Sequence, residues 1–304
     1  MSGNNAHFAQ FIQHRKQKNW TRNIGDKLRK AGVTLLVFVF CFMMVIPFIW
    51  TISSSLKAER EIFAYPPQFF PTEVTFDNYL IVMGQHERIR PQVSLARAYW
   101  NSIIVTIPGV IGPLVTAILA AYAFARLKFP ARDFLFFLYL VTMIVPIQVL
   151  IVPQFMLANA LGIYNTHWAL IIPYLSVAYA VFLLRQSFMS IPQDLIDAAK
   201  IDGAGHLGVI RHVIVPASSA TIAALAILLF VWRWNDFTHP LIMLNRRDLY
   251  TIPLALSALI QDRENARTGG LLAGTILAIL PLFVVFVIAN RQFIRSMVHT
   301  GVKG

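Results

Sequence analysis

Charged residues are scarce in this chain, and cysteine is nearly absent. Only 13% of the 304 residues are charged, whereas soluble domains carry about a quarter, so the composition excludes an ordinary soluble domain. Cys41 is the single cysteine and lies within an apolar run. One cysteine can form neither a disulfide within the chain nor a thiolate metal cluster. The eight histidines do not follow the spacing of metal ligands. We therefore expect no metal site.

Two signatures of chemistry are also missing. The chain has no G-x-x-x-x-G-K-[ST] segment, the loop that binds the phosphates of ATP. The serine run at Ser53, Ser54 and Ser55 lacks the flanking glycines of a nucleophile elbow. We therefore expect no enzyme active site and no cofactor held by this chain.

Long hydrophobic runs are what the chain does have. Hydrophobic residues make up 57% of the sequence, and runs of about 20 residues match the bilayer core at a rise of 1.5 Å per helical residue. The pattern predicts an all-α membrane protein, with a basic tail over 1–30 and six transmembrane helices over 31–304. The predicted spans are 31–52, 101–125, 134–157, 168–185, 217–241 and 269–289. In the second span we expect helix breaks at Pro108, Gly109, Gly112 and Pro113.

Basic residues cluster in alternate loops, which predicts the orientation in the membrane. The tail 1–30, the turn from Arg126 to Arg132 and the carboxyl end are basic, whereas the loop 158–167 carries no charge. Loops rich in lysine and arginine stay in the cytoplasm. We therefore expect cytoplasmic N- and C-termini, and we attribute the net charge of +12 to this rule rather than to nucleic acid. The tail is equally compatible with an amphipathic helix on the headgroups and with a disordered segment.

A polar stretch, Asp197–Pro216, lies between two apolar runs and reads DAAKIDGAGHLGVIRHVIVP. Its first five residues favour helix. Gly203 and Gly205 can then turn the chain, because glycine adopts positive φ without a Cβ clash. A second short helix is expected over about 206–213. The stretch therefore predicts a helix–turn–helix on the membrane surface.

This stretch resembles the EAA loop of the permeases of binding-protein-dependent ABC importers, here over residues 191–216, with an aspartate in place of the usual glutamate. The resemblance is closest to the carbohydrate-uptake branch, like the second membrane subunit of the maltose importer. It implies the type I ABC importer permease fold in a bacterial inner membrane. It assigns coupling to an ATPase to Asp197, Ala198, Ala199, Asp202, Gly203, Ala204 and Pro216.

The resemblance also implies partners. These are a second, homologous permease, a homodimer of ATPase subunits that binds ATP and Mg, a periplasmic solute-binding protein, and the lipid bilayer. Asp197 would accept hydrogen bonds from the turn around Gly203 or from a basic residue of the ATPase, and added bulk and charge at Gly203 would uncouple the complex. By position, contacts with the binding protein are expected at Asn245, Arg246, Arg247, Gln261 and Asp262.

Several polar and aromatic residues are candidates for a substrate pathway. Such groups bind sugars by hydrogen bonds and ring stacking, but polar residues also hold membrane helices together. The pair Arg233 and Asp236 is either an interfacial pair flanked by tryptophans, which we favour, or a functional intramembrane pair. The pathway candidates are Gln148, Gln154, Tyr174, Tyr179, Trp232 and Asn235.

Together these features predict the transmembrane permease subunit of an ATP-driven importer for a sugar or oligosaccharide. Arginines in the external loops leave an acidic, uronate-type oligosaccharide open as a minor alternative. An ion-gradient-driven secondary transporter would show internal repeats and a midplane ion site, and we find neither in the sequence. A non-transporting scaffold would leave the patterned loop unexplained.

Overall fold

The computed structural model describes the backbone of residues 3–89, 91–261 and 267–300, and the side chains of residues 29–89, 91–261 and 267–289. Within these ranges the chain forms helices and no strand. The predicted all-α fold is therefore confirmed.

Four helices in the described ranges are long and apolar enough to cross a bilayer. They are Arg29–Ser55 within α1 (Gly3–Ser55), Leu95–Arg126 (α4), Trp168–Met189, and Thr268–Ala289 within α15 (Thr268–Thr300). Trp168–Met189 contains α7 (Trp168–Ile171), η2 (Ile172–Tyr174) and α8 (Ala178–Met189). Two bent helix pairs raise the number of spans to six if each pair crosses once.

The first bent pair covers the third predicted span, 134–157. α5 (Arg132–Val141) and η1 (Thr142–Ile144) end before Pro146, and α6 (Ile147–Ala160) follows at an angle of 97°. Val145 is extended, with ψ at 116°, because proline disfavours helical geometry in the residue before it. The third predicted span therefore corresponds to a helix pair that is bent at Pro146.

The second bent pair joins the polar stretch to the fifth predicted span, 217–241. The first arm of this pair consists of α10 (His206–Val209), the π-helix η3 (Ile210–Ile214) and α11 (Val215–Ala217). It leads into α12 (Ser219–Trp234) with a bend of 83°. α12 ends at Trp234, and the short α13 (Thr238–Met243) follows.

The second predicted span contains no break, so that expectation was wrong. α4 continues through Pro108 and Pro113. A Cβ on Gly109 would lie 2.8 Å from Cδ of Arg233, and one on Gly112 would lie 2.5 Å from Cδ2 of Leu175. These glycines therefore allow close packing of neighbouring segments against a continuous helix.

The segment between the fifth and sixth predicted spans contains η4 (Arg247–Leu249) and the apolar helix α14 (Ile252–Gln261). α14 packs against α4 and α15 and buries four of its residues there, Ile252, Leu254, Ala255 and Leu259.

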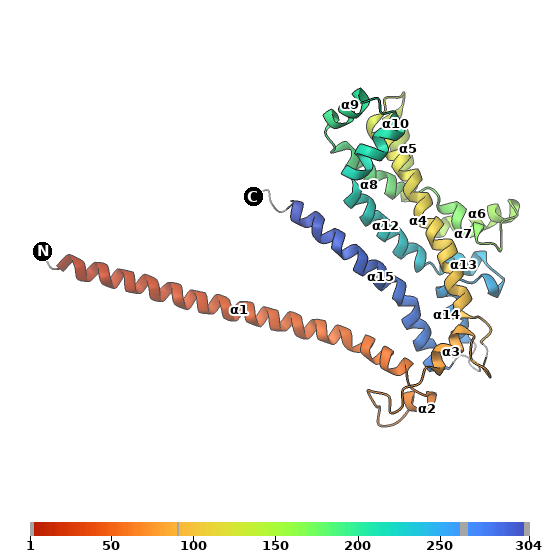
Figure 1. The fold of residues 1–304 in the computed structure, drawn as a ribbon, viewed down its shortest axis with the longest axis horizontal. Coiled ribbons are helices and arrows are strands. Elements are labelled where there is room, and N and C mark those ends of the chain that lie inside the picture. Colours follow the sequence, from red (N-terminus) through yellow and green to blue (C-terminus); the bar gives the residue numbers. More distant parts are fainter. Residues whose placement is uncertain (1–2, 90, 262–266, 301–304) are drawn as a thin grey trace.

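α4 is the axis of the bundle and packs against α8, α12 and α14 (Figure 1). α9 (Gln193–Ile201) and α10 lie at one end of α4, whereas α3 (Asp77–Met83) and α14 lie at the other, near α2 (Glu59–Ile62). α1 leans away from the bundle, and the apolar side chains along its membrane segment are exposed.

Candidate functional site

The turn after α9 has a conformation that favours glycine. Gly203 has φ of +85°; its N–H donates to the Lys200 carbonyl at 3.0 Å, and the Ala204 N–H donates to the Ala199 carbonyl at 2.9 Å. This pair of bonds is a Schellman motif, which closes a helix with a left-handed residue. A Cβ on Gly203 would meet no atom within 4 Å. Within this chain, the constraint on Gly203 is therefore its backbone conformation and not the space around it.

Asp197 lies on the open face of α9. Its Oδ1 accepts a hydrogen bond from Gln193 Nε2 at 3.0 Å and lies 3.9 Å from Lys200 Nζ. The described bonds of the Gly203 turn are made by the backbone, so the carboxylate is not used there. That Asp197 binds a basic residue of a partner protein stays a prediction.

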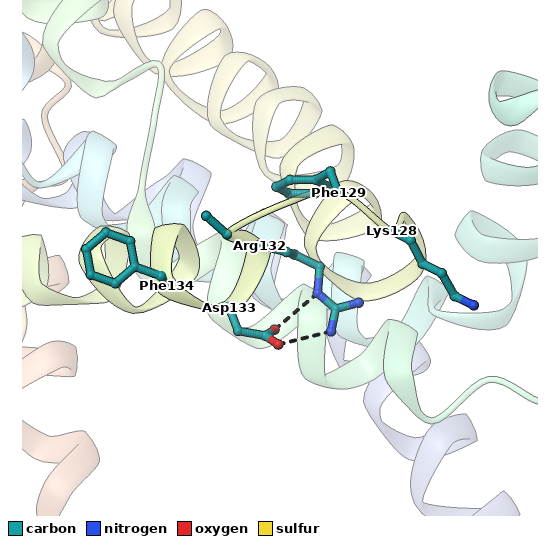
Figure 2. Close-up of a pocket in the computed structure, with 6 residues that line it drawn as sticks. Lys128, Phe129, Arg132, Asp133 and Phe134 are labelled. Atoms are coloured by element: carbon teal, nitrogen blue, oxygen red, sulfur yellow. Dashed lines mark hydrogen bonds and ion pairs between the residues drawn. The ribbon is translucent and has the colours of Figure 1, made fainter.

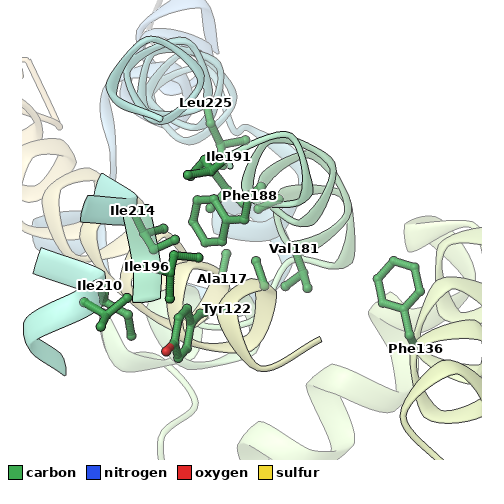
Figure 3. Close-up of a cluster of buried hydrophobic side chains, with 14 of the residues drawn as sticks. Ala117, Tyr122, Phe136, Val181, Phe188, Ile191, Ile196, Ile210, Ile214 and Leu225 are labelled. Atoms are coloured by element: carbon green, nitrogen blue, oxygen red, sulfur yellow. The ribbon is translucent and has the colours of Figure 1, made fainter. Parts of the chain in front are cut away.

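The inner face of the stretch is packed into the bundle. Ile196 and Ile214 are buried in one cluster with Ala117 and Tyr122 of α4 and Phe188 of α8 (Figure 3). The Tyr122 hydroxyl also forms a hydrogen bond with His206 Nδ1 at 3.0 Å. The stretch and the end of α4 therefore form one packed unit.

Arg126, the last residue of α4, strengthens this unit. Its guanidinium donates to the carbonyls of Phe188 and Ile191 and, at 3.0 Å, to Oε1 of Gln193. These bonds tie α4 to the connection between α8 and α9. A displacement of α9 must therefore either move α4 or break charge-assisted hydrogen bonds, which are about twice as strong as neutral ones.

The outer face of the same stretch carries large apolar side chains that this chain leaves exposed. Ile201 is 86% exposed and Leu207 is 73% exposed, and Leu195 is exposed beside them. Among the predicted coupling residues, Asp197, Ala198, Asp202, Gly203 and Pro216 are exposed, whereas Ala199 and Ala204 are half-buried. Large apolar side chains exposed together with charged ones are compatible with a protein interaction surface. We call the surface formed by residues 195–207 the coupling face.

A second feature is a cavity of about 630 Å³ between η1, α6, η2, α8 and α12. It brings together four of the six predicted pathway residues, Gln154, Tyr174, Tyr179 and Trp232. Gln148 and Asn235 do not line it and are exposed. The cavity wall also contains polar residues that were not predicted from the sequence as pathway residues. They are Thr142, Ser176, Arg233, Asp236 and His239.

A network of charged and aromatic side chains forms one wall of the cavity. Asp236 Oδ2 lies 3.5 Å from Arg233 Nη1 and 3.2 Å from His239 Nδ1. His239 Nε2 is in turn hydrogen-bonded to the Tyr174 hydroxyl, and Cζ of Arg233 lies 3.3 Å from the Tyr174 ring centroid. The Arg233 and Asp236 side chains are only 11% and 17% exposed. The pair therefore belongs to the cavity wall.

The two tryptophans that we expected to flank the pair at the membrane interface differ in their surroundings, because Trp232 lines the cavity and Trp234 does not. Trp234 is buried, and its Nε1 donates to the Ala278 carbonyl at 2.9 Å. In the sequence, the only indication for His239 is its position three residues after Asp236. This spacing is too common to identify a functional residue.

The lining suits a ligand that is rich in hydroxyl groups. The rings of Tyr179 and Trp232 lie 6.1 Å apart between centroids and offer apolar faces. The Oε1 atom of Gln154 is buried without a hydrogen-bond partner in the described residues, and such an orphaned acceptor is costly unless a water or ligand satisfies it.

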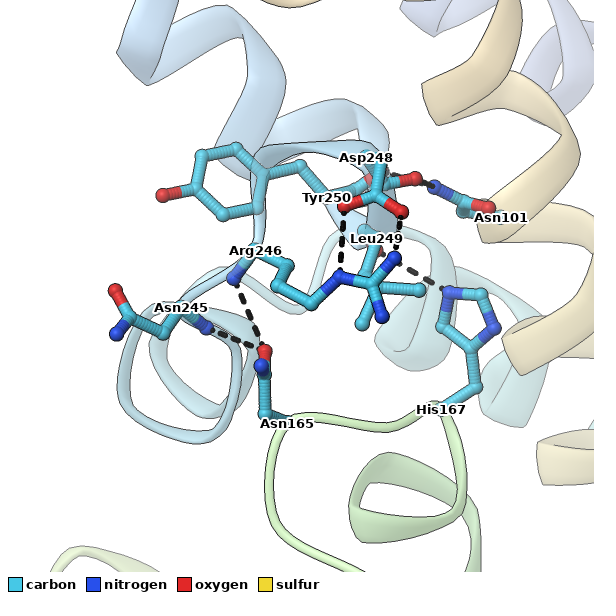
Figure 4. Close-up of polar contacts among 8 residues, drawn as sticks. All are labelled: Asn101, Asn165, His167, Asn245, Arg246, Asp248, Leu249 and Tyr250. Atoms are coloured by element: carbon cyan, nitrogen blue, oxygen red, sulfur yellow. Dashed lines mark hydrogen bonds and ion pairs between the residues drawn. The ribbon is translucent and has the colours of Figure 1, made fainter.

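Three of the predicted contacts with a binding protein, Asn245, Arg246 and Arg247, lie on a well-anchored loop near the start of α4 (Figure 4). Asn165 Oδ1 accepts the N–H groups of Asn245 and Arg246 at 2.9 and 3.0 Å. Asn101 Nδ2 donates to the carbonyls of Asp248 and Tyr250 at 2.8 and 3.0 Å. The loop is therefore a fixed platform.

The exposed side chains of this platform include Asn245, Arg246 and Arg247, with Gln261 exposed at the end of α14. Asp262 lies outside the described residues. Arg246 pairs with Asp248 at 2.6 Å, and this hydrogen-bonded pair holds the pKa of the Asp248 carboxyl below its usual value.

Comparison with known proteins agrees with the resemblance. The family model for the binding-protein-dependent transport system inner membrane component matches residues 113–299. The sn-glycerol-3-phosphate transport system permease protein UgpE of Brucella abortus (strain 2308) is 32% identical over 288 residues, which cover 94% of this chain and 99% of that protein. The arabinooligosaccharides transport system permease protein AraQ of Halalkalibacterium halodurans is 32% identical over 269 residues, which cover 86% of this chain and 92% of that protein.

A solved structure shares the fold. It is a bacterial ABC transporter involved in the import of the acidic polysaccharide alginate, and it superposes with a TM-score of 0.75 at 22% identity. The match covers 88% of this chain and 98% of the compared chain.

Proposed function

The chain belongs to the family of inner membrane components of binding-protein-dependent ABC importers, and from this premise we propose that it moves a sugar or oligosaccharide through the cavity described above. It is a multi-pass permease of the bacterial inner membrane. The cargo would reach it from a periplasmic binding protein, and the energy from two ATPase subunits. A second, homologous permease would complete the pathway.

The observation that carries this proposal is the connection between the coupling face and the cavity. α4 is bonded to the α8–α9 connection through Arg126, and its Gly109 packs against Arg233 of the cavity wall. An ATPase that grips the coupling face and closes on ATP would therefore move α4 against the cavity wall. A switch driven by a ligand requires contacts that differ between its two states. The connection through α4 would provide such contacts.

The proposed cargo is a neutral sugar rather than an acidic one. The arginine of the cavity wall is paired with Asp236, and Arg246 on the external platform is paired with Asp248. Within the cavity wall, the pairing of Arg233 with Asp236 leaves little positive charge to attract a carboxylate. The aromatic and hydroxyl-bearing lining then favours ring stacking and hydrogen bonding over charge recognition.

The proposal can be tested by uptake of labelled oligosaccharide into vesicles that contain the full complex. Trp232→Ala is expected to lower the uptake rate about tenfold, the equivalent of about 1.4 kcal/mol, because it removes a ring of the cavity wall. Trp100→Ala is the matched control, since Trp100 is exposed on α4 and does not line the cavity. Equal effects of the two variants would argue against this cavity as the pathway.

The same vesicles separate the proposal from an ion-gradient-driven transporter. With ATP inside, uptake is expected to continue when a protonophore and ionophores collapse the ion gradients. Uptake that stops under these conditions, and that does not need ATP, would favour the rival function.

A further inference from the structure

We propose that the turn between α4 and α5 binds the headgroup of an anionic phospholipid in the cytoplasmic leaflet. The turn borders an open hollow of about 450 Å³ that is lined by Lys128, Phe129, Ala131, Arg132, Asp133 and Phe134 (Figure 2). It lies at the same end of α4 as the coupling face. The choice of leaflet rests on the proposed function, because that function places the coupling face in the cytoplasm.

The charges of the turn leave an excess of positive charge. Asp133 Oδ1 lies 3.1 Å from Arg132 Nε and 3.6 Å from Arg185 Nη2, so a single carboxylate is shared by two guanidinium groups. Lys128 is exposed, and its ammonium group extends away from this pair (Figure 2). Basic pockets on the cytoplasmic side of membrane proteins attract anionic headgroups.

An apolar stripe on α5 continues from this pocket. Phe134, Phe137, Leu138 and Val141 are exposed, and their spacing places them on one face of the helix. Phe136, on another face, is buried against the bundle. A headgroup in the pocket would therefore have apolar surface beside it for its acyl chains.

A lipid fits this combination better than a protein partner does. A second permease could cover the apolar stripe, but the stripe gives it no use for the excess positive charge of the neighbouring turn. An anionic phospholipid carries the negative charge and the apolar chains in one molecule. We therefore assign the site to the lipid and treat a protein occupant as an outcome of the test.

Native mass spectrometry of the complete purified complex, titrated with dioleoyl phosphatidylglycerol or dioleoyl phosphatidylcholine, tests the headgroup site. We expect phosphatidylglycerol to bind more tightly than phosphatidylcholine, and Lys128→Gln to weaken phosphatidylglycerol binding about fivefold. Arg247→Gln removes an exposed arginine near the start of α4, where Asn101 binds the carbonyl of Asp248, and is expected to have no effect. Equal binding of the two lipids, or equal loss in the two variants, would overturn the proposal.

A photo-reactive amino acid in place of Phe134 tests the occupant of the stripe. We expect it to cross-link to phosphatidylglycerol in the assembled complex, whereas a cross-link to the second permease would overturn the assignment to lipid. Neither measurement uses ATP or sugar. Failure of the lipid site would thus leave uptake intact, and failure of the importer function would leave lipid binding measurable.

Discussion

Gly203→Val is expected to lower sugar-stimulated ATP hydrolysis by the reconstituted complex about tenfold, whereas Gly205→Val is expected to leave it close to wild type. Gly203 has φ of +85°, and Gly205 has φ of −70° and ψ of 177°. A left-handed conformation costs a residue with a Cβ about 1–2 kcal/mol, and more for a β-branched side chain. The extended conformation of Gly205 accepts valine without this strain. Valine at 203 therefore reshapes the coupling face, and valine at 205 does not.

The two positions form a matched pair. A Cβ at either one would meet no atom within 4 Å, so added volume within the chain is the same in both variants. Gly203→Asn serves as a rescue, because asparagine tolerates the left-handed region better than other residues do. Equal loss in the two valine variants would show that side-chain bulk against the ATPase, rather than backbone conformation, governs coupling.

Removing only one charge of the cavity pair is expected to destabilise the complex strongly. Arg233→Met leaves the Asp236 carboxylate in a largely buried site with His239 as its remaining partner. Breaking a buried ion pair in this way costs about 3–5 kcal/mol. The double variant Arg233→Gln with Asp236→Asn removes both charges and keeps hydrogen-bonding groups in place, so most of the stability is expected to return.

The measurement is the thermal stability of the detergent-purified complex, followed by size-exclusion chromatography after heating. The assembled peak of Arg233→Met is expected to disappear at a temperature several degrees below that of wild type. The assembled peak of the double variant is expected to disappear at a temperature close to that of wild type. If the double variant were as unstable as Arg233→Met, the loss would come from the packing of the Arg233 stem against Gly109 and the stacking of its guanidinium on Tyr174, and not from an unpaired charge on Asp236.

The short helix and the turn at Gly203 could be predicted from the sequence because their determinants are local. An acid, two alanines and a glycine at fixed spacing define a short helix and its end, and the structure has that helix at α9 and that turn at Gly203. The partner of Asp197 was not predicted correctly within this chain. It is Gln193, one turn earlier on the same helix, a residue that no motif marked.

Long-range contacts were beyond local reasoning. Arg126 binds carbonyls of the α8–α9 connection, far away in sequence, and His239 joins Tyr174 from another helix. The glycines of α4 illustrate a related difficulty, because a glycine that breaks a helix and one that admits a neighbouring side chain look alike in sequence. α14 was missed because its apolar run is too short for a membrane span and lies between charged residues.

The claim that the coupling face transmits ATPase motion to the cavity is tested most directly by cross-linking. Cys41 is the only cysteine, so a Cys41→Ser background carrying Leu207→Cys offers a single reactive thiol on the coupling face. With a short thiol-directed photo-cross-linker on the assembled complex in sealed vesicles, we predict a product with the ATPase subunit that changes in yield when ATP is added. A thiol placed at Asn245 should give none. Absence of an ATPase product from position 207, or an equal product from position 245, would contradict the account.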